Sequence, residues 1–194
     1  MSLLKKLLIG LLLLVVAAVG STFFMDDNFR VNHTQVVKAT PEAVFNQINT
    51  IKNWPNWSYW STLDPKMVTT YNEIPSGVGA GDSWTSEKKE VGNGSMTIKV
   101  SEPNTYISFD LKFDGEGNAF SEYILKPVDG GTEVTTGFNM ETKGIMMKLM
   151  SRTMMKRGMT KAFKASMDAL DKYLQANPTV AAPAATTPPD SAKI

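Results

Sequence analysis

The feature that most constrains this chain is an uncharged apolar run near its N-terminus. Residues 7–25 contain no charged side chain across nineteen positions, and Lys5 and Lys6 precede the run. As an α-helix the run would extend roughly 28 Å, close to the ~30 Å hydrocarbon core of a bilayer. Lysines before a membrane helix favour a cytoplasmic N-terminus. We therefore expect residues 1–25 to form a single-pass anchor, with the rest of the chain outside the cytoplasm.

Two other interpretations of this run remain open. Small residues at Ala18, Val19 and Gly20 follow an apolar segment at residues 7–16, which is the pattern of a cleavable signal peptide. The run also has the length of a core helix in a soluble domain. The anchor and the signal peptide both place the remaining chain beyond the membrane.

The C-terminal end has the composition of a disordered tail. Residues 177–194 are rich in Pro, Ala and Thr and contain no aromatic side chain. Such a segment offers little apolar surface to offset the entropy of ordering. The sequence therefore predicts an anchor at 1–25, one domain at 26–176 and a disordered tail at 177–194. A domain of about 150 residues is large enough to bury a hydrophobic core.

The composition excludes several classes of site. Twenty basic and nineteen acidic residues give a net charge of +1, which supplies no overall attraction for nucleic acid. The chain has no cysteine and a single histidine, His33. It therefore cannot form a disulfide, a thiolate metal site or a multi-histidine metal site. We expect no metal, no cofactor and no nucleic-acid partner.

The periodicity of the body changes from strand to helix and back. Residues 29–38 have the pattern of a strand, and Thr40 and Pro41 then provide an N-cap and a first helical residue. Between residues 67 and 140, strand-like segments alternate with turns rich in Gly, Pro and Asn, and residues 107–113 alternate apolar with polar side chains. This pattern predicts an antiparallel meander with one solvated face.

The C-terminal segment returns to a helical period but contains a register change. After Gly158 the apolar side chains fall on one stripe, made of Met159, Phe163, Met167, Leu170 and Leu174. The methionines at 146–154 lie on the opposite azimuth. One straight helix cannot bury both stripes, so we predict a break or sharp turn near Gly158. The methionines and the basic residues near them then form either a solvated helix face or an amphipathic element at a membrane surface.

Several short motifs follow one another in an order that belongs to a known superfamily. A strand-to-helix motif of the form A-x-P-x-x-V-F lies at residues 39–45. The others are Asn53-Trp54-Pro55-Asn56-Trp57-Ser58, Asp64-Pro65, Gly77-Val78-Gly79-Ala80, Gly94-Ser95-Met96-Thr97-Ile98, Glu102-Pro103 and Gly130-Gly131-Thr132-Glu133-Val134-Thr135. Through their order and spacing, residues 29–174 resemble the START-like (SRPBCC) superfamily. The local sequences are most similar to bacterial polyketide cyclase/dehydrase-like proteins with an N-terminal membrane segment.

The resemblance implies an α+β helix-grip fold, a curved antiparallel sheet wrapped around a long C-terminal helix, here preceded by a transmembrane helix. It also implies an elongated apolar cavity between the sheet and the helix, where family members hold lipids or other hydrophobic molecules. The side chains expected on the cavity wall are Trp57, Trp60, Trp84, Phe109, Tyr123, Met150, Met154, Phe163 and Met167. The aromatic side chains among them also fit the role of core residues.

The superfamily contains both carriers and enzymes, so the fold alone does not decide the function. The candidates for acid–base catalysis are Asp82, Asp110, Glu122, Tyr123 and His33, and none has a partner at a spacing typical of a catalytic pair. We therefore assign no catalytic residue and favour a membrane-anchored binding protein for a hydrophobic small molecule or lipid. A cyclase/dehydratase-like or hydrolase-like enzyme and an envelope protein-interaction module remain as alternatives.

For such a binding protein the expected location is a bacterial inner membrane. The N-terminus would lie in the cytoplasm and the C-terminal domain in the periplasm. The expected partners are the hydrophobic ligand and, through the N-terminal helix, the membrane. We expect a monomer.

Overall fold

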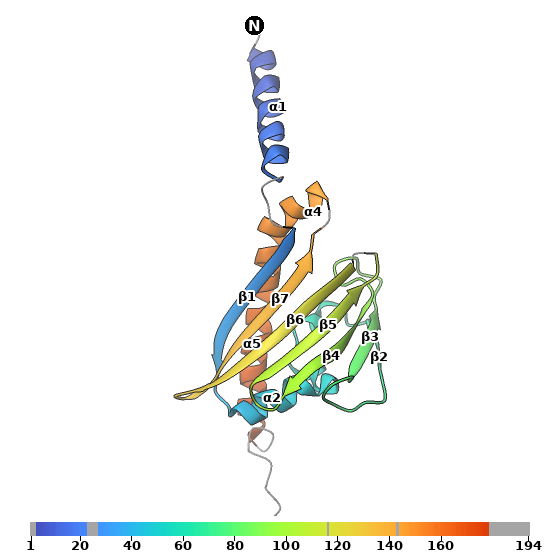
Figure 1. Cartoon of the computed structure of the whole chain (residues 1–194), viewed down its shortest axis with the longest axis vertical. Helices are drawn as coiled ribbons and strands as arrows, with labels where there is room; N and C mark the ends of the chain where they lie inside the picture. Colours follow the sequence, from blue (N-terminus) through green and yellow to red (C-terminus); the bar gives the residue numbers. More distant parts are fainter. Residues whose placement is uncertain (1–2, 23–26, 116, 143, 179–194) are drawn as a thin grey trace, which may run out of the picture.

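The computed structural model describes residues 3–22, 27–115, 117–142 and 144–178. The tail predicted at residues 177–194 lies outside these ranges except for its first two residues. One antiparallel sheet of seven strands has the order β1-β7-β6-β5-β4-β3-β2. The strands are β1 Asn28–Val37, β2 Val68–Tyr71, β3 Gly81–Thr85, β4 Gly94–Glu102, β5 Tyr106–Phe113, β6 Gly117–Val128 and β7 Gly131–Glu141. The strands from β2 to β7 form a meander, and the first strand closes onto the last, as Figure 1 shows.

The junction of β6 and β7 depends on glycine. Asp129 and Gly130 form the turn between the paired residues Val128 and Gly131, and Gly130 has a φ of 85°. An Asp-Gly turn of this kind is typical of a tight hairpin, because glycine adopts positive φ without a steric penalty. A Cβ on Gly131 would overlap the Val37 carbonyl oxygen. The turn therefore fixes where β7 begins beside the end of β1.

Short helices follow β1, as the sequence predicts. In α2, Pro41–Asn49, Pro41 occupies the first turn and the Thr40 hydroxyl accepts a hydrogen bond from the Ala43 N–H at 3.3 Å. This cap satisfies a backbone donor that the first turn leaves free. A 3₁₀ helix, η1 Ile51–Asn56, and a single turn, α3 Trp60–Leu63, complete the connection to β2.

The long helix α5, Lys156–Ala176, lies along one face of the sheet (Figure 1). Its inner stripe is buried and includes Phe163, Met167, Leu170 and Leu174. On its flank, the Gln35 side chain of β1 donates a hydrogen bond to the Asp168 carboxylate at 2.8 Å. The predicted helix-grip fold is confirmed, with the sheet curved around this helix.

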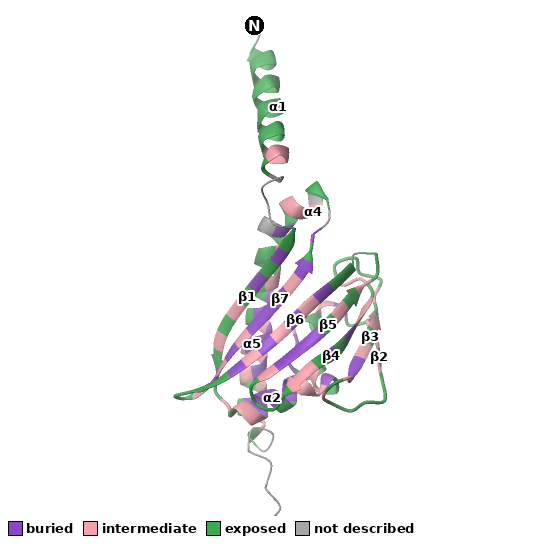
Figure 2. Cartoon of the chain, in the orientation of Figure 1, coloured by how far each residue is buried: buried purple, intermediate pink, exposed green. Residues whose placement is uncertain are grey.

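The core occupies the space between the sheet, α2 and α5. Figure 2 shows that β5, β6 and β7 carry many of the buried positions of the sheet. A larger cluster of buried side chains surrounds Ile48, Phe109 and Leu170, and a smaller one surrounds Phe138 and Phe163. The members of these clusters that lie on strands, such as Phe109 and Phe138, follow the alternation of the strand, which is why the strand periodicity of the sequence was informative.

The predicted break at Gly158 is wrong. The chain stays helical from α4, Ile145–Met150, through a π-helical segment, Ser151–Met155, into α5, which passes through Gly158. The wider turn of a π-helix rotates the side chains that follow relative to those before it. The register change is therefore absorbed just before Lys156, and Lys156 and Arg157 remain exposed.

Because Gly158 lies inside a continuous helix, replacing it with alanine should stabilise the protein, whereas a break at Gly158 would predict a loss of stability. Gly158 is exposed, its φ is not positive, and a Cβ there would meet nothing within 4 Å. Gly158→Ala should therefore raise the free energy of unfolding by up to about 1 kcal/mol, through helix propensity. Urea denaturation of the full chain checks this. Gly144→Ala is the control, because Gly144 has equal space but a φ of 84° and should lose stability. Loss of stability in both variants would contradict the prediction.

The N-terminal helix α1, Leu3–Thr22, extends away from the folded body (Figure 1). It is one helix of sufficient length and apolar character to cross a membrane, and none of the apolar window is buried. Its large side chains are exposed, so the helix does not pack as the core helix of a soluble domain. The membrane anchor and the signal sequence therefore remain as the two interpretations.

Candidate functional site

A cavity of about 470 Å³ lies between the sheet, α5 and the segment that runs from η1 to β2. This volume falls within the range of small-molecule sites, roughly 300–1,000 Å³. Most of the wall is apolar. Its aromatic members are Trp54, Trp60, Tyr71, Trp84, Phe109, Phe113, Tyr123, Phe138 and Phe163.

The strand register creates the space. Ser121 on β6 pairs with Phe109 on β5 and with Phe138 on β7, and all three side chains line the cavity. Ser121 is small, and its hydroxyl donates a hydrogen bond to the Gly137 carbonyl at 2.9 Å. A small, internally bonded side chain between two phenylalanines leaves a hollow that a larger residue would fill.

A group of packed aromatic rings makes one side of the wall rigid. The Trp54 ring centroid lies 5.3 Å from that of Phe109 and 6.1 Å from that of Tyr123, with edge-to-face geometry in both pairs. The Trp54 indole N–H donates to the Ile48 carbonyl at 2.9 Å. This bond satisfies the polar edge of the ring, so the remainder of Trp54 can face the apolar space.

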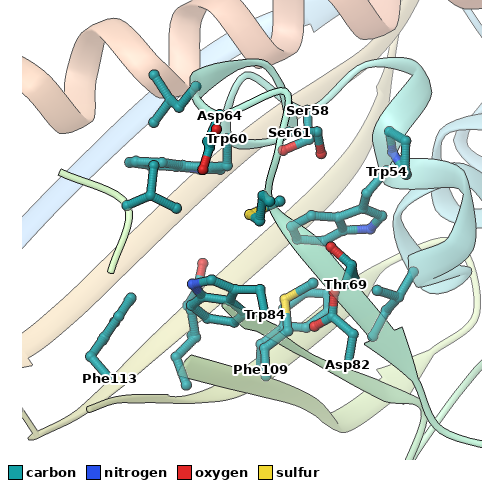
Figure 3. Close-up of a pocket in the computed structure, with 18 of the residues that line it drawn as sticks. Trp54, Ser58, Trp60, Ser61, Asp64, Thr69, Asp82, Trp84, Phe109 and Phe113 are labelled. Atoms are coloured by element: carbon teal, nitrogen blue, oxygen red, sulfur yellow. The ribbon is translucent and has the colours of Figure 1, made fainter. Parts of the chain in front are cut away.

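The structure places the predicted wall residues in three groups. Trp60, Trp84, Phe109, Tyr123 and Phe163 line the cavity. Figure 3 labels the first three of them. The other four predicted residues are not among the lining residues: Trp57 and Met167 are buried in the core, and Met150 and Met154 are exposed.

Two local features explain these differences. The 3₁₀ helix η1 directs Trp54, rather than Trp57, at the cavity, and Trp57 packs behind it at a centroid distance of 5.1 Å. The π-helical segment shifts the helix register, so Met155 and Met159 line the cavity while Met150 and Met154 face outward.

Comparison with known proteins identifies the family. Residues 28–175 match the model of the family described as polyketide cyclase / dehydrase and lipid transport. The chain belongs to this family. No curated protein matches the sequence.

Solved structures share the fold of this family member at low sequence identity. A protein of unknown function from Staphylococcus aureus, SA2116, superimposes with a TM-score of 0.61 at 9% identity, covering 78% of this chain and 96% of that one. A protein from Rhodobacter sphaeroides gives a TM-score of 0.56 at 18% identity, with 76% and 93% coverage. CalU16 from Micromonospora echinospora gives 0.50 at 13% identity, with 77% and 78% coverage. At these identities the likeness concerns the fold alone.

The description of the polyketide cyclase / dehydrase and lipid transport family covers both catalysis and transport. Catalysis would require polar or ionisable groups on the cavity wall. Asp82 on β3 is the carboxyl group on the wall whose pKa burial raises. Burial raises the pKa of its carboxyl from 3.8 to about 6, opposed only by a hydrogen bond from its own backbone. Its Oδ1 is buried and has no hydrogen-bond partner among the described residues.

Two tyrosines on the same wall are also altered. Tyr71 pairs with Asp82 across β2 and β3, and burial together with the Asp82 charge raises the pKa of its phenol. Burial also raises the pKa of Tyr123 far above its ordinary value. Both phenols therefore stay protonated at neutral pH and present hydrogen-bonding groups rather than charges.

The carboxylate of Asp64 has a different environment from that of Asp82. It accepts hydrogen bonds from the Ser86 hydroxyl at 2.6 Å and from the Lys66 N–H at 3.0 Å. These bonds hold the pKa of Asp64 below its usual value. Asp64 therefore stays ionised and fixes the loop before β2 to the end of β3.

The other acid–base candidates lie outside the cavity wall. Asp110 forms an ion pair with Lys99 at 3.3 Å, and Glu122 accepts a hydrogen bond from the Tyr106 hydroxyl at 2.9 Å. His33 contacts Gln35 at 3.2 Å and is not among the lining residues. Within the described ranges, no three His, Cys, Asp or Glu side chains are grouped so as to hold a metal ion.

Proposed function

We propose that this chain is a membrane-anchored protein that binds a hydrophobic small molecule or lipid in its internal cavity. The observation that carries the proposal is an apolar cavity of about 470 Å³ inside a folded domain. Large aromatic side chains surrounding an open volume have no packing partner on that side, and an apolar ligand would supply one. The open cavity also disfavours a protein-interaction module, which would need its apolar surface on the outside.

An enzyme on the same fold is the second candidate, and Asp82 is the observation that favours it. A carboxyl with a pKa of about 6 in an apolar site has the properties of a general base or acid. However, no hydrogen-bonded acid–base pair is present among the described residues of the wall. The binding protein therefore accounts for the site with fewer assumptions.

The proposed closeness of the domain to the membrane follows from the position of its first described residue, Asp27. Asp27 follows the end of α1 at Thr22 by a few residues, so it cannot lie far from an anchored helix. Asp27 pairs with Lys148 of α4, and its carbonyl accepts the Thr142 N–H at 2.6 Å. We infer from these contacts that α4 lies close to the membrane.

The methionines near α4 lie both on the protein surface and on the cavity wall. Met150 and Met154 are 41% and 70% exposed, whereas Met155 and Met159 line the cavity. Flexible methionines can accommodate ligands of different shape and can contact lipid chains. We infer that the hydrophobic ligand exchanges between bilayer and cavity past this segment.

The orientation in the inner membrane is testable by fusion. Alkaline phosphatase joined after Met25 should be active, because Lys5 and Lys6 retain the N-terminus in the cytoplasm and the fused enzyme would reach the periplasm. A reporter that requires the cytoplasm, fused at the same residue, should be inactive. The reverse pair of activities would contradict the orientation.

Filling the cavity should weaken ligand binding. Thr69 on the edge strand β2 lines the cavity, and its neighbour Thr70 is exposed on the opposite face. Thr69→Trp should weaken binding of a neutral apolar probe, 2-naphthalenemethanol, by at least about tenfold, because the new ring occupies the space. Calorimetry on the full chain in nanodiscs measures the affinity.

Thr70→Trp is the matched control for this substitution. It adds the same side chain to the same strand, outside the cavity, so affinity should stay within about twofold of the wild type. Equal affinity in the two variants would contradict binding in the cavity.

A further inference from the structure

Among the residues that the structure describes, the cavity wall includes acidic side chains but no basic ones. Three described lining residues are acidic, Asp64, Asp82 and Glu90, and none of the described lining residues is Lys, Arg or His. A ligand that brings a carboxylate or phosphate into the cavity would therefore find no counter-ion among the described lining residues. A ligand that brings a positive charge would find one.

Among the three acids, Asp82 is the one with unused hydrogen-bonding capacity inside the cavity. Both Asp64 oxygens already accept hydrogen bonds, from Ser86 and from the backbone of Lys66. Glu90 is exposed in the loop after β3. The Oδ1 of Asp82 is buried and has no partner within the described part of the chain. A buried acceptor without a donor is costly to the protein, and a ligand that supplies the donor removes that cost.

The surroundings of Asp82 suit a cation rather than only a neutral donor. Trp84 follows Asp82 by two residues on the same strand, and Tyr71 pairs with Asp82 on β2. All three side chains line the cavity, and Figure 3 shows Asp82 and Thr69 on the same side of it as Trp54. Aromatic faces attract ammonium groups, and a carboxylate beside them adds a charged hydrogen-bond acceptor.

We propose that the cavity selects apolar molecules that carry one protonated amine, with Asp82 as the counter-ion, and discriminates against apolar carboxylates. This inference rests on the proposed function and narrows its ligand class. The amine N–H donates to Asp82, and the apolar part of the ligand packs between the aromatic rings. Because the pKa of Asp82 is about 6, its carboxyl is mostly ionised at neutral pH and available as a counter-ion.

A matched series of probes tests the proposal on the full chain in phosphatidylcholine nanodiscs, with empty nanodiscs as the blank. The probes are 2-naphthylmethylamine, 2-naphthalenemethanol and 2-naphthoate, which share one ring system and differ in the polar group. At neutral pH the wild-type chain should bind the amine at least about tenfold more tightly than the carboxylate, and several-fold more tightly than the alcohol.

Two variants test whether Asp82 causes the preference for the amine. Asp82→Asn keeps the shape and removes the charge, so the amine-to-carboxylate affinity ratio should fall close to one. Asp110→Asn makes the same change on the outer face, where Asp110 pairs with Lys99. It should leave the ratio at the wild-type value.

The outcomes separate the two proposals. If none of the three probes binds, both the proposed function and this inference fail. If the alcohol binds but the amine has no advantage over it or over the carboxylate, only the amine preference is overturned. If the amine-to-carboxylate affinity ratio of Asp82→Asn equals that of the wild type, Asp82 is not the counter-ion. The same conclusion follows if the ratio falls as much in Asp110→Asn as in Asp82→Asn.

Discussion

Replacing Phe109 with alanine should lower the free energy of unfolding by about 3–5 kcal/mol. Phe109 is fully buried, and its ring packs against Trp54 and Tyr123 with centroid distances of 5.3 and 5.9 Å. Removing the ring deletes these contacts and leaves a void continuous with the cavity, which the rigid sheet cannot close. Urea denaturation of the full chain in a neutral detergent, followed by tryptophan fluorescence, measures the loss.

Phe113→Ala provides the matched comparison. Phe113 lies on the same face of β5 and also lines the cavity, but it is only half-buried and packs against Trp84 at 5.8 Å. Its loss of stability should be less than half that of Phe109→Ala, because less apolar surface returns to water. Equal losses in the two variants would mean that Phe109 is not the central packing residue.

The second large effect concerns charge, and Asp82→Asn should stabilise the protein at high pH. The folded-state pKa of about 6 exceeds the ordinary value of 3.8, so folding favours the protonated carboxyl. The folded protein therefore binds more protons than the unfolded chain between these two values. Wild-type stability should fall, relative to the variant, as pH rises from about 4 to about 6, and should stay lower above that range.

The size of this effect follows from the pKa difference. The values of about 6 and 3.8 differ by roughly two pKa units. Each unit corresponds to about 1.4 kcal/mol. Solvent at the partly exposed carboxyl reduces the effect, so we expect Asp82→Asn to gain about 1–3 kcal/mol above pH ~7 and nothing below pH ~4.

Denaturation curves across this pH range provide the test. Asp110→Asn, on the outer face and paired with Lys99, is the control and should not reproduce the gain. Parallel pH profiles for the wild type and Asp82→Asn would contradict the environment assigned to Asp82.

The fold could be predicted from the sequence because its determinants are local. The Thr40-Pro41 pair sets the start of α2, and the turn at Asp129 and Gly130 sets the last hairpin. Alternation at residues 107–113 identifies the inner face of β5. Each of these signals depends on neighbouring residues in the chain, so it can be recognised without knowing the tertiary structure.

The sequence reveals the register change before α5 but does not identify the π-helical segment that causes it. Side-chain azimuths show that two stripes of the C-terminal segment do not align. A glycine kink and a π-helical insertion both resolve such a conflict. Gly158 is the local feature that suggests a kink, whereas the π segment at Ser151–Met155 has no comparable signature in the sequence.

The wall of the cavity could be predicted only in part. Trp84, Phe109 and Tyr123 lie on strands, where alternation indicates the inner face. Trp54 and Tyr71 were missed because a 3₁₀ turn and a four-residue edge strand give too few positions to show a period. The burial of Asp82 depends on its place in the cavity wall and on its pairing with Tyr71 of another strand, so its raised pKa has no local signal.

The most direct test of the central claim, that the cavity holds an apolar molecule, is native mass spectrometry of the full chain purified from its membrane. The wild type should carry one noncovalently bound apolar molecule per chain, which is released on unfolding. Thr70→Trp should retain this adduct and Thr69→Trp should lose it, because only Thr69 lines the cavity. The unliganded mass in every sample, or the same adduct on Thr69→Trp as on the wild type, would contradict the claim.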